Sequence, residues 1–524
     1  MVKILREWSL FLRFLWPATR TVGRMASPLF LSACAFFKGM PLPSPPVALR
    51  VQCATASVVG LAWTLSRDAS SISGYRIYRD GILIGTTPRS DYSDTSVSGA
   101  APYDYGVAAV DAAGRSSAPA ALAVTTATAS PNGDAPYCHS QAIGSMLWHW
   151  SDGYTQANGS DLWPATWGTD GNVYLFFGDG GGFGGNDSLG RTSFGIARVT
   201  GKPPLDSAAL SNVYGGYHFE HAARLAGKAN SIIAVGTDFY VLGGIYGPAD
   251  SIKDYPHRPS GAPNRVQLAY SLRNAYSWRP ARWSFCGADA TGKGALTGTF
   301  CPASFINYGP GNAGAPGGYV YLLGNVNSAS QWSSGVAALP LNTYLARVPQ
   351  DRVLTHAAYQ YFAGLDRRGR PIWSADAARM QPIFSDRNVA QSGCGNLCNM
   401  AGSLGEVVYD AALKRYIGIA QGDYLAQTAF YDAPDAWGPW TSIAYDNIDA
   451  KAGTGGWAHL GTAAGDSLGV HPVNAWTSTD GKTLWLTFSS DGKAPADAFF
   501  PPAGTHMDAF SLLSVTLQPA DRAP

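Results

Sequence analysis

Charge is scarce in this sequence. Asp, Glu, Lys and Arg make up 14% of the 524 residues, against roughly 25% in an average soluble protein, and 37 basic residues are balanced by 36 acidic ones. A balanced surface has no basic field that would hold nucleic acid, so we expect no nucleic-acid partner. Long apolar runs are also absent, since none reaches the length of about 18 residues that a transmembrane helix needs.

Motifs for nucleotide cofactors and for serine hydrolysis are missing too. Residues 180–185 match the Gly-x-Gly-x-x-Gly spacing, but the next residues read as a loop and a strand, whereas a dinucleotide site needs a helix there. No Gly-Lys-Ser/Thr step completes a phosphate-binding loop, and no nucleophile elbow is present. We therefore expect no cofactor. A structural Ca²⁺ is compatible with the sequence, but no pattern indicates one.

Aromatic residues and turn formers are abundant. Aromatic residues make up 12% of the chain, including 16 Trp and 26 Tyr, and there are 61 Gly and 34 Pro. This composition is typical of an all-β extracellular protein. Exposed Trp and Tyr rings also stack well on sugars, although most rings of this kind pack in cores.

The seven cysteines indicate disulfides and an oxidising compartment. Cys286 and Cys301 bracket a short Gly/Thr-rich stretch, as a loop-closing bridge would. The spacing of Cys394 and Cys398 is also compatible with metal binding, but no second Cys or His pair completes such a site. The disulfide candidates are Cys53, Cys138, Cys286, Cys301, Cys394 and Cys398.

Residues 1–37 predict an export signal, because basic residues precede a short apolar run. Residues 31–34 (LSAC) resemble a bacterial lipobox, which implies cleavage before Cys34 and a lipid attached to it. Plain secretion and a translation start placed too early are the alternatives. An exported protein would be secreted, or would lie at the cell surface or in the periplasm. Residues 38–49 are a proline-rich, extended linker.

Residues 50–127 predict a β-sandwich. Short β runs alternate with turns, Asp80-Gly81 predicts a hairpin turn, and Trp63 is expected in the core. The stretches GYRIYRDG and PYDYGVAAVDAAGRSS resemble a fibronectin type III domain. This resemblance implies a spacer or docking module without chemistry of its own, and residues 128–157 are then a linker.

Five similar strand–turn–strand units follow between residues 158 and 520. Each is succeeded by one or two further strands, and repeats of roughly 60–80 residues predict a five-bladed β-propeller. The fold class is therefore all-β, with a sandwich followed by a propeller. The units cover residues 166–180, 231–247, 303–327, 405–424 and 474–492.

The first unit carries an Asp at each end of its predicted hairpin, Asp161 and Asp179. Antiparallel pairing about the turn at 169–172 would bring both to the same end of two neighbouring strands, where propellers usually hold ligands. An Asp after a strand is often only a turn former, so a structural role is the alternative. The candidate sugar contacts in this and other units are Trp163, Trp167, Arg191, Lys228, Glu406, Asp423, His471 and Asn474.

Several stretches, in order along the chain, resemble a bacterial propeller family described as domain of unknown function 4185. They include DLWPATWGTDGNVYLFFGDGGGFGG (161–185), GKANSIIAVGTDFYVL (227–242) and AWTSTDGKTLWLTFS (475–489). The resemblance implies a five-bladed propeller, and some members are endo-D-arabinanases. It places the family's acidic pair on Asp161 and Asp179. This chain has Gly-Asp-Gly where the family has Gly-Asp-Thr, so the glycan stays open.

Three functions fit these observations. The first is a secreted glycoside hydrolase that uses Asp161 and Asp179 as its carboxyl pair, with Asp423 or Glu406 as a third carboxylate that raises the pKa of the acid. The second is a carbohydrate-binding or adhesion propeller without catalysis, with the sandwich as a spacer. The third is sialidase-like or lyase chemistry, which needs an arginine cluster. In each case we expect a glycan partner and a monomer. The arginines available for the third are Arg191, Arg198 and Arg224.

Overall fold

The structure is a computed structural model whose ordered secondary structure is β throughout. In the described part of the chain the helices are single 3-10 turns of three residues, and none is long and apolar enough to cross a membrane. The described residues are 41–67, 72–129, 135–157, 160–178, 180–185, 194–215, 227–245, 265–287, 300–326, 342–366, 368–386, 404–421, 427–447, 467–492 and 507–520.

The N-terminal unit is the predicted β-sandwich. Its core includes Trp63, which is 3% exposed and lies edge-on to Tyr75 with ring centroids 5.1 Å apart. Asp80 and Gly81 both have positive φ, 52° and 78°, which confirms the predicted two-residue hairpin turn. One sheet holds β1 (Val47–Ala54), β2 (Val59–Thr64) and β5 (Asp91–Asp94). The other holds β3 (Ile72–Arg79), β4 (Ile82–Thr87), β6 (Pro102–Asp111) and β7 (Ala120–Thr125).

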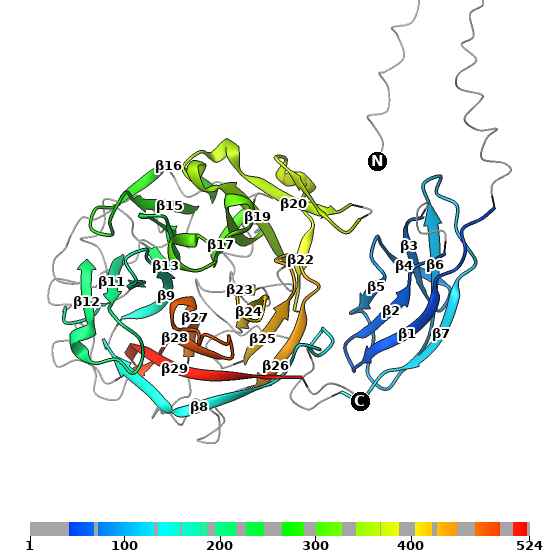
Figure 1. Ribbon diagram of the computed structural model, residues 1–524, viewed down its shortest axis with the longest axis horizontal. Helices are drawn as coiled ribbons and strands as arrows, with labels where there is room; N and C mark the ends of the chain where they lie inside the picture. Colours follow the sequence, from blue (N-terminus) through cyan, green and yellow to red (C-terminus); the bar gives the residue numbers. More distant parts are fainter. Residues whose placement is uncertain are drawn as a thin grey trace, which may run out of the picture.

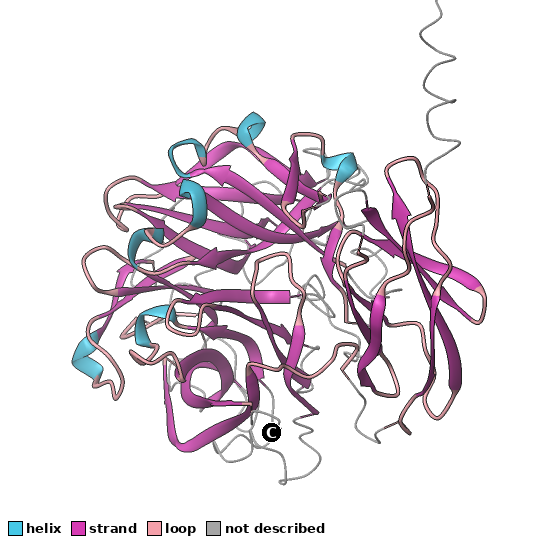
Figure 2. Cartoon of the chain, turned by 45° about the vertical axis from the view of Figure 1, so that its right-hand side comes forward, coloured by secondary structure: helices cyan, strands magenta, loops and turns pink. Residues whose placement is uncertain are grey.

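The rest of the chain forms a five-bladed propeller, beside which the sandwich lies (Figures 1 and 2). Each blade is an antiparallel sheet, and the apolar core lies between the faces of neighbouring blades. Blade 1 contains β9 (Asp161–Trp167), β10 (Val173–Gly178), β11 (Gly195–Val199) and β12 (Leu210–Tyr214). Blade 2 contains β13 (Gly227–Val235), β14 (Asp238–Ile245), β15 (Arg265–Ser271) and β16 (Arg279–Gly287).

Blades 3 and 4 follow the same plan and share a short parallel pairing between their inner strands. Blade 3 contains β17 (Phe300–Asn307), β18 (Tyr319–Val326), β19 (Thr343–Pro349) and β20 (Gln360–Leu365), with β21 (Pro371–Ser374) and β22 (Pro382–Phe384) added at its outer edge. Blade 4 contains β23 (Leu404–Asp410), β24 (Arg415–Gln421), β25 (Gln427–Ala433) and β26 (Thr441–Asn447).

The N-terminal end of the propeller completes its last blade. β8 (Ile143–Gln156) pairs with β29 (Met507–Pro519), which is the third strand of blade 5 after β27 (Ser467–Pro472) and β28 (Thr483–Gly492). The predicted linker at 128–157 is therefore wrong over β8, and the propeller begins before residue 158. The reason is physical, because a strand from one end of the chain closes the ring only by pairing with the other end.

The five inner strands β9, β13, β17, β23 and β27 all run in the same direction along the propeller axis. We call the face where they begin the start face and the face where they end the end face. The connection after β17 lies across the end face and contacts each of the other four blades. Its Gly311 accepts a hydrogen bond from Gly236 N at 2.9 Å in blade 2, and Tyr308 packs on Tyr409 and Tyr416 of blade 4.

Gly311 also shows why this crossing requires glycine. A Cβ there would lie 2.5 Å from Thr169 Cγ2 of blade 1 and 2.9 Å from the carbonyl oxygen of Gly236, and φ is +54°. The same loop reaches blade 5, where the Asn474 side chain lies near Gly309. The end face is thus closed around the axis by main chain of blade 3.

Candidate active site

The structure places Asp161 at the start face, where β9 begins. Asp161 pairs with Gly178, the last residue of β10, so the predicted position at the end of the first hairpin is confirmed for this residue. Its side chain is only 1% exposed. Asp179 follows Gly178 directly in the chain but lies outside the described residues, so its partnership with Asp161 stays a prediction.

The backbone after Asp161 has an unusual conformation. Leu162 and Trp163 have φ values of +78° and +61°, a left-handed region that residues other than glycine rarely adopt. Two hydroxyls of β28 hold this segment: Leu162 N donates to Ser489 Oγ at 2.7 Å, and Thr487 Oγ1 donates to the Trp163 carbonyl at 2.9 Å. Strained backbone of this kind gathers at functional sites, where the surroundings must hold it in place.

Similar hydroxyls support three of the other inner strands, and sequence reasoning did not find them. The inner edge of a propeller sheet leaves N–H groups without a strand partner, and a buried N–H needs an acceptor. Ala234 N donates to Thr166 Oγ1, Phe305 N to Ser231 Oγ, and Leu404 N to Thr343 Oγ1, each from one blade to the preceding one. In the sequence, these hydroxyls could have been recognised as a Ser or Thr at an inward position of an otherwise apolar strand.

Each inner strand also carries a β-bulge at the same place relative to its partner. In blade 4 the bulge falls between Leu404 and Glu406, and in blade 5 between Leu468 and His471. The residues that follow the five bulges are Ala165, Ser231, Ser304, Glu406 and His471. Two of these equivalent positions therefore hold titratable side chains, in neighbouring blades.

Those two side chains, Glu406 and His471, are in contact. Glu406 Oε1 lies 3.1 Å from His471 Nδ1, and the two residues are 5% and 2% exposed. Burial raises the pKa of the Glu406 carboxyl, and the neighbouring imidazole opposes that rise. The sequence predicted that both would converge near the axis at the start of the strands. Because they are buried against each other, they offer little surface to a sugar.

Three candidate sugar contacts are either buried in the core or lie away from Asp161. Trp163 is 0% exposed and stacks on Phe177 with centroids 5.2 Å apart, so the prediction that it binds sugar is wrong. Trp167 ends β9 at the end face, where it packs against the core between blades 1 and 5, far along the strand from Asp161. Asn474 also lies at the end face and donates to the Tyr409 carbonyl at 2.9 Å.

Other predicted residues fall outside what the structure describes. These include Arg191 and Asp423, and of Lys228 only the backbone is described, near the start of β13. Cys34, Cys394 and Cys398 are also outside. Among the described residues, no group of three or more His, Cys, Asp or Glu is arranged to bind a metal ion.

The cysteine predictions are confirmed where they can be examined. Cys53 and Cys138 form a disulfide across 85 residues of sequence. Cys301 is also disulfide-bonded. The side chain of Cys286 lies outside the described residues, so its pairing with Cys301 stays a prediction.

The fold and the start-face residues together define a five-bladed propeller joined to a β-sandwich, with buried acidic residues at one end of its axis. No family model matches the chain. Short segments are similar to curated proteins. The chain is 41% identical over 87 residues to an alpha-amylase of Niallia circulans. It is 35% identical over 126 residues to exoglucanase B of Cellulomonas fimi, and 36% identical over 91 residues to chitinase Chi52 of Paenibacillus xylanexedens. These matches cover 17%, 23% and 17% of this chain and only 7%, 12% and 17% of the relatives.

Solved structures are similar to the chain at low identity. A β-xylosidase, RS223, covers 68% of this chain and 94% of its own at 10% identity, with a TM-score of 0.36. A GH43_1 enzyme from Xanthomonas citri covers 71% and 92% at 11% identity, also with a TM-score of 0.36. The protein FN3tt covers 17% and 98% at 23% identity, with a TM-score of 0.15.

Proposed function

We propose that the protein is a glycoside hydrolase whose carboxyl pair is Asp161 and Asp179. The observation that carries the proposal is the setting of Asp161. It lies buried where the first inner strand begins, next to Gly178 and followed by two left-handed residues that blade 5 holds by hydrogen bonds. Backbone held in this way sets the direction of the Asp161 side chain before a substrate binds, and glycosidases need two carboxyls on either side of the bond they break.

The chemistry follows from the two carboxyls. One, protonated, donates its proton to the leaving glycosidic oxygen while the bond from that oxygen to the anomeric carbon breaks. The other, ionised, either removes a proton from a water that attacks the anomeric carbon or attacks that carbon itself. A separation of about 6.5–9.5 Å between the two carboxyls would give inversion, and about 5–5.5 Å would give retention.

The curated relatives support this choice of reaction class. The three described above are named as an alpha-amylase, an exoglucanase and a chitinase, all enzymes of glycan hydrolysis. Sialidase-like chemistry has less support. Of the arginines considered for it, Arg198 of β11 lies opposite Tyr174 of β10 near the end face, away from Asp161. Its Nη1 donates to the Tyr276 hydroxyl at 3.4 Å.

The same proposal places the enzyme outside the cytoplasm, because disulfides persist in oxidising compartments. Lipid attachment at Cys34 and a monomeric state belong to it as predictions. Mass spectrometry of the mature N-terminus would show diacylglyceryl-Cys34 if the lipobox is used, and an unmodified chain if the protein is simply secreted.

The test is reducing-end release from a panel of bacterial and plant polysaccharides, with D-arabinan included. Wild type, Asp161→Asn and Asp179→Asn are compared side by side, and binding of each protein to the same glycans is measured by affinity electrophoresis. Release by wild type that both variants lose, with binding retained, supports the hydrolase. Binding by all three proteins without release would instead identify a carbohydrate-binding propeller.

A further inference from the structure

A close approach of three blades connects the Glu406–His471 pair to Asp161. Gly469 in β27 has φ +63°, and a Cβ there would lie 2.8 Å from His471 Nε2 and 3.2 Å from the Leu162 carbonyl oxygen. The imidazole Nε2 and the Leu162 carbonyl oxygen therefore both lie on the side of Gly469 where a Cβ would point. Leu162 is the residue that follows Asp161, so the imidazole lies beside the backbone that carries this carboxyl.

The neighbouring strand β28 holds that backbone from a second side. His471 pairs with Thr487, whose hydroxyl donates to the Trp163 carbonyl. The His471 ring has its Nδ1 3.1 Å from Glu406 Oε1 in blade 4, and among the described residues neither ring nitrogen has a partner in full hydrogen-bond geometry. The ring thus lies between Glu406 of blade 4 and Gly469 of its own blade, close to the Leu162 carbonyl of blade 1.

We propose that His471 is a positioning residue, held by Glu406, which fixes the Leu162 backbone and thereby the Asp161 carboxyl. This inference rests on the proposed function and adds to it a role for the two buried side chains. Among the described residues, Glu406 from β23 is the ionisable group in contact with His471, and Asp161 precedes Leu162, whose carbonyl lies near the ring, in β9. Ser304 occupies the equivalent place after the bulge of blade 3 and is 0% exposed, which makes it a matched control.

The experiment measures kcat, KM and the pH profile of His471→Gln, Glu406→Gln and Ser304→Ala on whichever polysaccharide of the panel wild type cleaves. A misplacement of about 1 Å can cost roughly 100-fold in rate, so we expect kcat to fall by about 10- to 100-fold in the first two, with KM nearly unchanged and the pH profile shifted. Ser304→Ala should keep wild-type values. A purely structural role would lower the melting temperature while the folded protein keeps its kcat and pH profile, and that result would overturn the proposal.

A crystal structure of His471→Gln separates this inference from the hydrolase proposal. A displaced Asp161 and Leu162 is the expected result, whether or not any glycan is cleaved. If wild type releases no reducing ends but Asp161 moves in the variant, the function fails and the positioning role stands. If Asp161 stays in place, the positioning role is wrong.

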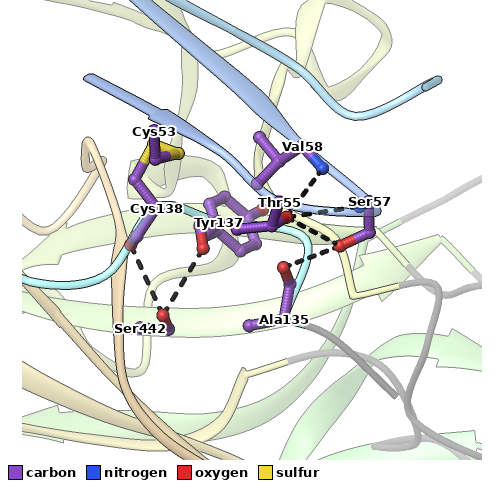
Figure 3. Close-up of a disulfide and its surroundings, with 8 residues drawn as sticks. All are labelled: Cys53, Thr55, Ser57, Val58, Ala135, Tyr137, Cys138 and Ser442. Carbon is purple, nitrogen blue, oxygen red and sulfur yellow. Dashed lines mark hydrogen bonds between the residues drawn. A yellow bond between two sulfur atoms is a disulfide. The ribbon is translucent and has the colours of Figure 1, made fainter. Parts of the chain in front are cut away.

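A second, independent observation concerns the joint between sandwich and propeller. Residues 135–140, which we call the strap, connect the two units and are fixed to both (Figure 3). On the sandwich side, Cys138 is disulfide-bonded to Cys53 of β1, and the Ala135 carbonyl accepts a hydrogen bond from Ser57 Oγ at 2.9 Å. Gly60 of β2 makes room for the bridge, since a Cβ there would lie 2.3 Å from Cys138 Sγ.

On the propeller side the strap is built into blades 3 and 4. Ser442 N of β26 donates to the Cys138 carbonyl at 2.9 Å, and Ser140 N donates to the Ser442 carbonyl at 2.8 Å. Tyr137 stacks on Phe384 of β22 with centroids 4.9 Å apart, and its hydroxyl donates to the Ser385 carbonyl at 3.2 Å. The disulfide thus joins the sandwich to a segment that belongs to the propeller core.

We infer that the Cys53–Cys138 disulfide makes the sandwich a rigid extension of the propeller, so that anything the sandwich binds is held at a fixed distance from the start face. A loosely tethered spacer would need no covalent bridge beyond the chain itself. The bridge also predicts that the geometry depends on redox conditions, because among the described residues reduction leaves the chain itself, weak contacts between sandwich and strap, and the charge interaction of Arg89 with Asp435 of blade 4.

Small-angle X-ray scattering tests this inference without any substrate. Wild type should fit one compact particle, whereas the double variant Cys53→Ser, Cys138→Ser should show a larger radius of gyration and a broad distance distribution. Ser57→Ala, which keeps the disulfide, should match wild type. If the double variant does not fold by circular dichroism, wild type treated with a mild reductant is measured instead. If the scattering curve of the protein without the disulfide, whether the double variant or reduced wild type, superimposes on that of oxidised wild type, the inference is wrong.

Discussion

The two ends of the propeller axis are built from the same five strands but differ in what they hold. At the end face, main chain of blade 3 crosses the axis through Gly311 and is hydrogen-bonded to blade 2. At the start face, the strands instead present Asp161 and the Glu406–His471 pair. At the end face the close contacts join one blade to another. At the start face the close contacts surround ionisable side chains.

Each end also has a buried aspartate on an inner strand, and the two have different roles. Asp410, the last residue of β23, is 2% exposed and accepts hydrogen bonds from Ala412 N and Leu413 N at 3.0 and 2.9 Å, so it caps the turn that follows. Burial raises the pKa of Asp410, and these N–H groups oppose the rise. Asp161 precedes strained backbone rather than a turn. Burial alone therefore does not distinguish the two aspartates, whereas the backbone that follows each of them does.

The largest expected effect is on stability, from a side chain at the crossing. Gly311→Ala places a Cβ against the Gly236 carbonyl and Thr169, and we expect a loss of about 3 kcal/mol in the free energy of unfolding. Gly171→Ala is the control, because Gly171 has φ +83° but nothing within 4 Å of its Cβ, and the left-handed backbone alone costs about 1–2 kcal/mol. Urea unfolding measures both. Equal losses would show that the end face is not closely packed at Gly311.

A smaller effect separates structural from functional hydroxyls. Ser489→Ala leaves the buried Leu162 N–H without its acceptor, and Ser231→Ala does the same to the Phe305 N–H. Each variant should lose about 1–3 kcal/mol in the free energy of unfolding. Of these two serines, only Ser489 supports the backbone next to Asp161. We therefore expect folded Ser489→Ala to lose kcat while folded Ser231→Ala keeps it, as measured by reducing-end release. Equal kcat values for the two would remove the distinction between Ser489 and the other hydroxyls.

The smallest effect is the pH dependence of stability that Glu406 contributes. Its pKa in the folded protein is raised above the ordinary value of 4.5, so the folded state keeps the proton to higher pH than the unfolded state does. The stability tied to the protonated form is present below pH 4.5 and is lost as pH rises through the raised pKa. Wild type should therefore lose stability relative to Glu406→Gln above pH 4.5, by about 1.4 kcal/mol per unit of pKa shift. Denaturant melts of both proteins between pH 4 and 8 measure this difference, and a constant difference would contradict it.

Local patterns predicted the fold well wherever partners are close in sequence. The hairpin of β9 and β10, the Asp80-Gly81 turn and the buried Trp63 all follow from alternation and turn residues within about twenty positions. The outer strand β8 was missed because its partner β29 lies at the other end of the chain. No local pattern names a partner at that distance.

The candidate site was predicted only in part, for a related reason. Alternation cannot distinguish an aromatic ring that packs in the core, such as Trp163, from one that faces a ligand. Asn474 was misplaced because the fifth inner strand is Ser467–Pro472, so Asn474 follows its end instead of preceding its start. Polar residues at matching offsets did bring Glu406 and His471 to neighbouring blades, but only the structure shows that they contact each other.

The most direct test of the difference between the two ends is a single comparison of rates. Reducing-end release from the same polysaccharide is measured for wild type, Asp161→Asn and Asp410→Asn, each normalised to folded protein. General acid–base catalysis contributes roughly 10²–10⁴-fold, so Asp161→Asn should lose at least about 100-fold, while Asp410→Asn, whose amide oxygen still caps the turn, should keep the wild-type rate. Equal losses in the two variants, or a wild-type rate in Asp161→Asn, would contradict the assignment of the start face as the catalytic end.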